Sequence, residues 1–158
     1  MAGSSTADGR FYYDLAWPQA YVVAEDRLDV EWVPVRMDPA FRCAEEVAAV
    51  REDVARAAAA RGLMPVRWPD PFPADTDWAM LVATYAKQIG RAVAFSLAAF
   101  RQAFAGGRDL GDRDTVLIAA AGCEMHPAAV MKGASLRSTR ERLEQATAEA
   151  RAAGVHAP

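Results

Sequence analysis

Residues 11–17 form an aromatic run that leads directly into Pro18, and this junction constrains the fold more than any other part of the chain. Aromatic side chains favour a β-strand. Proline suits the first turn of a helix, because its missing N–H would be unpaired there. We therefore expect a short buried strand, a tight turn and a helix. The start of that helix would present free backbone N–H groups and a positive dipole end, which can hold a thiolate or a carboxylate.

The residues at this junction carry no reactive group of their own. Trp17, Pro18, Gln19 and Ala20 include neither a nucleophile nor a titrating base. We interpret Trp17, Pro18 and Gln19 as a ligand-binding surface at the start of the helix, and we assign no catalytic residue.

A second strand is expected over residues 30–37, after the first helix ends near Leu28. A connection through a helix makes a βαβ unit, in which the two strands are parallel and the crossover is right-handed. Pro34 cannot donate to a sheet, so it favours an edge strand or a bulge. From Cys43 onward apolar residues recur at helical spacing, which predicts a mostly helical remainder apart from a proline-rich connector over residues 63–73.

The run from Tyr13 to Tyr21 resembles the start of a DsbA-like thioredoxin domain, in which a Cys-Pro-x-Cys motif opens the first helix. It resembles still more the branch of 2-hydroxychromene-2-carboxylate isomerase and kappa-class glutathione transferase, which has Tyr-Phe-Asp-Phe-x-Ser-Pro-x-x-Tyr there. Trp17 stands where this branch has Ser and where DsbA has its first Cys. Ala20 stands where DsbA has its second Cys. The resemblance therefore excludes thiol-disulfide exchange at this motif.

The resemblance implies an α/β fold of the thioredoxin-like DsbA or kappa type, with a large helical domain inserted into a βαβ unit. We assign residues 1–9 to a disordered leader, 10–42 to the thioredoxin-like βαβ portion and 43–153 to the helical insertion domain. Residues 154–158 would begin the cis-proline loop of the family, with Pro158 at or just before that proline. The resemblance thus leads us to expect that the C-terminal ββα part of the family is absent from this chain.

A sheet of only two parallel strands would leave apolar side chains without cover. Phe11, Tyr13, Val33 and Val35 belong to strands whose family counterparts lie against further strands. Open strand edges with apolar faces recruit a partner or aggregate. We therefore expect a homo-oligomer, such as a dimer, or a partner chain that covers the incomplete sheet.

The resemblance continues after the connector, where the isomerase branch has a Pro-x-Asn-Thr helix start. This chain has the run Pro73-Ala74-Asp75-Thr76 at that point. Asp75 is therefore a candidate ligand-binding residue, and Pro158 is another because it falls at the cis-proline loop. The simpler interpretation is that Asp75 or Thr76 caps the following helix, a role that needs no ligand.

Composition limits the classes of function. A net charge of -3 gives no electrostatic reason to bind nucleic acid. Apolar runs are shorter than the roughly 20 residues that span a bilayer, and residues 1–9 do not resemble a signal peptide, so we expect a cytoplasmic protein without a membrane partner. Cys43 and Cys123 are far apart and lack a metal-type spacing with either histidine. We expect free thiols and no metal site.

Three functions are consistent with these features. The first is an isomerase-like or glutathione-transferase-like protein that binds a thiol or a small anionic aromatic ligand at the start of the first helix, without dithiol redox chemistry. Glutathione is its candidate cofactor, and none is required. The second is a catalytically inactive binding or assembly module of the same fold. The third is an oxidoreductase by family only, because dithiol exchange needs a reactive cysteine pair. Whether the chain is an enzyme stays open.

Overall fold

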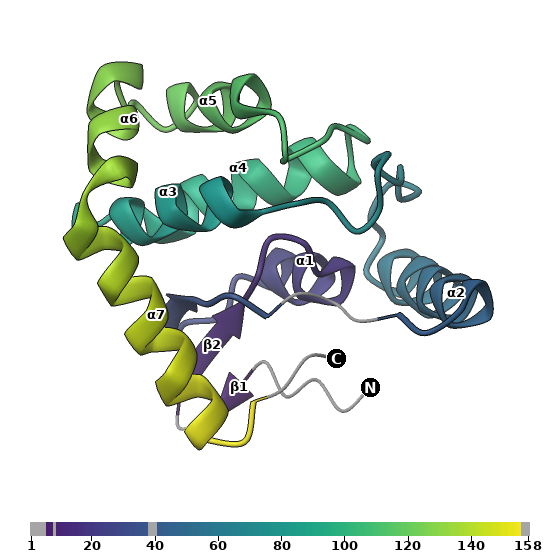
Figure 1. Ribbon diagram of the computed structural model, residues 1–158. Coiled ribbons are helices and arrows are strands. Elements are labelled where there is room, and N and C mark those ends of the chain that lie inside the picture. The colour runs from purple at the N-terminus through teal and green to yellow at the C-terminus, as the bar shows by residue number, and fades with distance from the viewer. Residues whose placement is uncertain (1–5, 8, 38–40, 156–158) are drawn as a thin grey trace.

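A computed structural model describes residues 6–7, 9–37 and 41–155 of the chain (Figure 1). A small sheet and its crossover helix are followed by a series of helices. The elements are β1 (Thr6–Ala7), β2 (Arg10–Tyr13), α1 (Pro18–Glu25), β3 (Glu31–Pro34), α2 (Ala44–Ala60), α3 (Asp77–Gln88), α4 (Ala92–Phe104), α5 (Arg113–Ala121), α6 (Pro127–Ser135) and α7 (Arg137–Ala152).

The sheet has three strands in the order β1-β2-β3. β2 and β3 are parallel, with Phe11 opposite Trp32, and α1 connects them, so the predicted βαβ unit is confirmed. β1 pairs antiparallel with β2. The prediction of a disordered leader over residues 1–9 is therefore wrong at Thr6–Ala7. A two-residue strand has too little sequence pattern to be recognised, because it forms only through its ladder with β2.

The outer edge of β3 is covered by helices of the same chain. Lys87 of α3 donates from Nζ to the carbonyl oxygen of Trp32 at 3.0 Å, and the backbone N–H of Arg36 donates to Thr147 Oγ1 of α7 at 2.9 Å. These contacts satisfy backbone groups that an edge strand would otherwise expose. Figure 1 shows α7 running along this side of the sheet.

The four strand side chains that were expected to lack cover are buried. Phe11, Tyr13 and Val35 are 0% exposed and Val33 is 8% exposed. The expectation that a partner chain must cover them is wrong, because helices from the second half of the chain pack on the sheet. Lack of cover on the strands therefore no longer supports homo-oligomer formation, which stays a prediction.

Aromatic rings fill the space between the sheet and α4. Phe11 packs edge-on against Trp32 at 4.9 Å between ring centroids, and Tyr13 lies 5.9 Å from Phe100. The Tyr13 hydroxyl and Ser96 Oγ are 2.6 Å apart, so the phenol is hydrogen-bonded although it is fully buried. Burial raises the pKa of Tyr13 well above its usual value and keeps it neutral. This core fixes α4 on the βαβ unit.

Helices α3 to α6 form two layers above the βαβ unit (Figure 1). α3 contacts β3 and α4 contacts α1, whereas α5 and α6 form an outer layer that packs on α3 and α4. α2 stands at the far side beside α1 and buries only Val54 and Ala58. Within the described residues, no helix is both long and apolar enough to cross a membrane.

Gly133 allows α6 to approach α3. A Cβ atom at this position would overlap the ring of Tyr85, so we expect Gly133→Ala to lower the free energy of unfolding by about 1–3 kcal/mol through overpacking. In a Tyr85→Ala background the clash is gone, and the same change should stabilise the helix by up to about 1 kcal/mol. Urea unfolding of the four variants in this double-mutant cycle measures the reversal.

Gly122→Ala is the control for this prediction. Gly122 ends α5 with φ -63 and ψ -15, and an added Cβ would have its nearest neighbour at 3.5 Å, an ordinary contact. We expect its effect to stay within about 0.5 kcal/mol. A destabilising Gly133→Ala in both backgrounds would show that the Tyr85 ring is not the cause.

Candidate functional site

The turn between β2 and α1 is held by Asp14. The backbone N–H of Trp17 donates to the Asp14 carbonyl oxygen at 3.0 Å, and the N–H of Ala16 donates to Asp14 Oδ1 at 3.0 Å. Pro18 then opens α1 with Trp17 at the N-cap. The predicted strand, tight turn and helix are therefore confirmed, and an aspartate side chain fixes the turn.

The same carboxylate reaches two other parts of the chain. Asp14 Oδ2 accepts the backbone N–H of Met37 at 3.0 Å, just beyond β3, and Asp14 Oδ1 accepts the Thr76 hydroxyl at 2.6 Å, at the start of α3. Arg36 Nη1 lies 3.5 Å from Asp14 Oδ2 and donates to Thr76 Oγ1 at 2.7 Å. We call Asp14, Arg36 and Thr76 the Asp14 cluster. It joins the ends of both parallel strands to α3.

Burial dominates the ionisation of this cluster. The Asp14 side chain is 0% exposed, and loss of solvation raises its pKa to about 6, although the bonds from Thr76 and Ala16 and the charge of Arg36 act in the opposite direction. A carboxyl group with such a pKa gains and loses a proton near neutral pH. No reactive thiol or histidine lies in the Asp14 cluster, so its visible role is to fix the turn.

Three of the five predicted ligand-binding residues are consecutive in the sequence at the start of α1. Trp17 is 2% exposed and its indole N–H donates to the Met37 carbonyl oxygen, Pro18 is buried, and Gln19 is half-buried. Gln19 is therefore the member of this trio with most access to a ligand. Pro158 lies outside the described residues.

Asp75 does not join that trio by any described contact. Its side chain is exposed, and Oδ1 accepts the backbone N–H of Asp77 at 3.0 Å at the start of α3. The capping interpretation is thus confirmed for Asp75. Thr76 occupies the N-cap position without capping, because its hydroxyl is bonded to Asp14. Sequence reasoning missed Thr76 and Arg36 as partners of the turn.

The two cysteines are free and lie in different parts of the molecule. Cys43 is exposed just before α2, and Cys123 is buried just after α5. Burial raises the pKa of the Cys123 thiol, which makes it a poorer nucleophile. Among the described residues no group of His, Cys, Asp and Glu side chains has the arrangement of a metal site.

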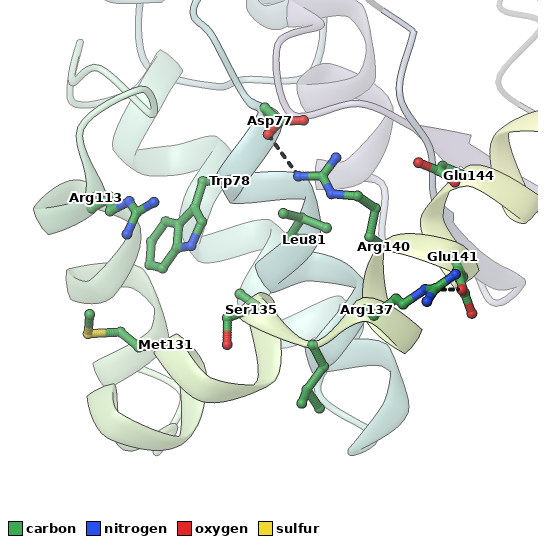
Figure 2. A pocket seen from close by; sticks show the side chains of 12 residues that line it. Asp77, Trp78, Leu81, Arg113, Met131, Ser135, Arg137, Arg140, Glu141 and Glu144 are labelled. Carbon is green, nitrogen blue, oxygen red and sulfur yellow. Dashed lines mark hydrogen bonds and ion pairs between the residues drawn. The ribbon is translucent and has the colours of Figure 1, made fainter.

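A cavity of about 740 Å³ lies between α3, α5, α6 and α7 (Figure 2). Its wall combines apolar side chains with three arginines and three acids. The lining residues are Asp77, Trp78, Leu81, Arg113, Met131, Ala134, Ser135, Leu136, Arg137, Arg140, Glu141 and Glu144. The cavity is linked to the Asp14 cluster, because Asp77 lies 3.9 Å from Arg36 Nε and 3.2 Å from Arg140 Nη2.

Comparison with known proteins identifies the family. The model of the DSBA-like thioredoxin domain matches residues 15–156, which is most of the chain. The chain belongs to the DsbA-like thioredoxin family. The predicted α/β fold of this type is therefore confirmed. A search of curated proteins found no match to this DsbA-like chain.

Solved structures show the same fold. A 2-hydroxychromene-2-carboxylate isomerase superposes with a TM-score of 0.78 at 16% identity, over 92% of this chain and 80% of that one. A probable DsbA oxidoreductase from Streptomyces coelicolor has a TM-score of 0.72 at 20% identity, over 92% and 75%. A putative protein disulfide isomerase from Nitrosomonas europaea has 0.71 at 15%, over 92% and 79%. Similarity at these identities establishes the fold of this DsbA-like chain and leaves its ligand and its chemistry to be proposed.

The raised pKa of Asp14 predicts a distinct pH dependence of stability. The folded carboxyl group binds its proton more tightly than the unfolded one, whose pKa is 3.8. Its contribution is therefore fully present below pH 3.8 and is lost as the pH rises through about 6. The loss amounts to at most about 3 kcal/mol, since one pKa unit is worth about 1.4 kcal/mol. Asp14→Asn should abolish this decline, measured by urea unfolding from pH 3.5 to about 7.

Glu31→Gln provides a control of opposite sign. Hydrogen bonds from Arg10 and Lys87 lower the pKa of Glu31, so its contribution is present above its unfolded pKa and is lost as the pH falls. If the wild type and Asp14→Asn change in parallel between pH 4 and 6, the assignment to Asp14 is wrong.

Proposed function

We propose that this DsbA-like chain binds a small thiol-bearing or anionic aromatic ligand at the start of α1 and performs no dithiol redox chemistry. The observation that supports this proposal is Trp17 at the N-cap of α1, where its indole is buried and hydrogen-bonded to Met37. A side chain in that place cannot act as the attacking thiol. The start of the helix keeps its positive dipole end, which favours an anion.

Gln19 supports the location of the proposed ligand. It lies in the first turn of α1, and it is more accessible than Trp17 and Pro18. The first turn of α1 contains no acidic residue, so an anion there meets no repelling carboxylate within α1. Glutathione carries both a thiol and carboxylates and is the cofactor we propose to test.

An isomerase-like activity is the enzymatic form of this proposal. The fold shared with a 2-hydroxychromene-2-carboxylate isomerase supports it as an analogy between folds. We propose no catalytic residue, because the Asp14 carboxyl group is enclosed by backbone and side-chain partners. The chain would then contribute binding and orientation of the ligand.

A second candidate function is that of an inactive binding or assembly module. Trp17 and Pro18 are both buried, which favours a turn in which these side chains serve packing. In this alternative the chain keeps the fold and binds another copy or another protein. A cytoplasmic location fits both proposals.

We expect no dithiol reductase or oxidase activity from the purified protein. Exchange needs an accessible thiolate and a resolving thiol, and Cys43 and Cys123 are separate free cysteines, one exposed and one buried. Insulin reduction and refolding of a scrambled substrate measure both directions of exchange. Turnover that persists in a Cys43→Ala, Cys123→Ala variant would place redox chemistry elsewhere and contradict the proposal.

A charge at the start of α1 tests the binding site. Gln19→Glu should stabilise the free protein by about 0.3–1 kcal/mol through the helix dipole and should weaken binding of an anion. The readout is the rise in melting temperature with glutathione concentration, because a ligand at a hundredfold its Kd stabilises by about 2.7 kcal/mol. S-methylglutathione separates recognition of the thiol from recognition of the carboxylates.

Gln145→Glu is the matched control, since it places the same charge on the exposed face of α7. The proposal requires weaker glutathione binding in Gln19→Glu and unchanged binding in Gln145→Glu. Equal binding by both variants would exclude the start of α1 as the glutathione site.

A further inference from the structure

The cavity between α3, α5, α6 and α7 has an apolar wall beside a cationic group. Trp78 and Leu81 contribute from α3, and Met131 and Leu136 from α6 and the junction with α7. Met131 is 49% exposed and Leu136 is 44% exposed, so part of this wall faces solvent. A volume of about 740 Å³ is within the range of small-molecule sites, roughly 300–1,000 Å³.

Two of the three arginines in the wall are already engaged by acids. Arg140 Nη2 lies 3.2 Å from Asp77 Oδ2, and Arg137 Nε lies 2.9 Å from Glu141 Oε1. Figure 2 shows both pairs at the α7 side of the cavity. Each pair joins one positive and one negative charge, and Glu144 adds a further negative charge on that side. The hydrogen bond to Asp77 and the charge of Asp77, with a smaller contribution from Glu144, raise the pKa of Arg140.

Arg113 differs from these two arginines. Its guanidinium lies 4.8 Å from the ring centroid of Trp78, and no ion pair to a carboxylate is found for it among the described residues. Figure 2 places Arg113 and Trp78 together on the side of the cavity away from Glu144. The flanking acids Asp112 and Asp114 do not line the cavity, and Asp112 accepts the N–H of Asp114. Arg113 therefore presents a positive charge next to the indole.

From this arrangement we propose that the cavity binds a small organic acid with a planar apolar body. Its carboxylate pairs with the Arg113 guanidinium, which has the fork of donors that suits a carboxylate. Its apolar body lies against Trp78, Leu81 and Met131, where it displaces water from apolar surface. Arg113 is the one arginine of this wall without an ion pair among the described residues, and a single guanidinium favours a monoanion over a phosphate dianion. This inference rests on the proposed function for its class of ligand, a small anionic aromatic molecule. The cavity itself is separate from the start of α1.

The test uses 2-naphthoate as the probe and the full chain as the protein. Calorimetry should show binding of 2-naphthoate and at least tenfold weaker binding of the neutral isostere 2-naphthamide, because a charged hydrogen-bonded pair is lost. Arg113→Gln should weaken 2-naphthoate binding about tenfold for the same reason. Arg142→Gln, on α7 and outside this cavity, should leave the affinity unchanged. Circular dichroism melts confirm that each variant is folded.

An NMR signal locates the bound probe. The indole N–H resonance of Trp78, assigned by its absence in Trp78→Phe, should shift as 2-naphthoate is added, since the proposed body of the ligand lies on this ring. A shift that is confined to other tryptophans would overturn the inference. So would equal affinity for the acid and the amide.

The two sites are distinguished by their variants. Binding of 2-naphthoate that Gln19→Glu weakens and Arg113→Gln leaves intact would overturn the cavity inference and support the proposed function at α1. Binding of glutathione without any binding of 2-naphthoate would also overturn the cavity inference and support the proposed function. Failure of both ligands to bind the wild type would overturn both.

Discussion

The hydrogen bonds that the buried Asp14 carboxylate accepts are the interaction on which the rest of this structure depends. An ionised carboxylate in the interior costs several kcal/mol unless charged and hydrogen-bonded partners surround it. Here the partners come from the turn itself, from the end of β3 and from the start of α3. The partners can satisfy the carboxylate only when all three segments are in place. The same group therefore sets the start of α1 and the position of the helical layers relative to the sheet.

The effect of Asp14 extends to the cavity through a series of charges. Arg36 contacts Asp14 and also lies near Asp77, and Asp77 pairs with Arg140 of α7. Arg140 and Asp77 are thus used to fix α7 beside α3. Arg113 lies on α5, outside this series, and its described contact is the face of Trp78. Arg140 thus has an ion pair because it joins α7 to α3, whereas Arg113 takes no part in that junction.

Much of this fold follows from local sequence signals. The aromatic run before Pro18 predicts β2 and α1, Asp112 caps α5, and Pro127 opens α6. Each of these signals acts within a few residues. The pairing of β2 with β3 also follows, because a helical crossover leaves parallel pairing as the simple solution.

What could not be predicted depends on contacts between distant residues. Thr76 has the sequence signature of a helix cap, but its hydroxyl bonds to Asp14, which is 62 residues away in the chain. Lys87 and Thr147 satisfy backbone groups at the outer edge of β3 and just beyond it. Their role cannot be predicted until the positions of α3 and α7 are known. The cavity unites residues from 77 to 144 of the chain. No spacing rule brings Arg113 next to Trp78.

Trp17 explains how a DsbA-like fold can persist without the chemistry of a cysteine at this position. In this chain the indole fills the turn and donates to the Met37 carbonyl oxygen, in the same segment that Asp14 holds through the Met37 N–H. The two bonds fix both backbone groups of Met37, so the end of β3 is anchored to the turn from two sides. A small side chain at position 17 would leave that carbonyl unpaired and open a gap beside it, which costs stability. Trp17 therefore supplies a structural contact at the start of α1, at a position where it offers no reactive group.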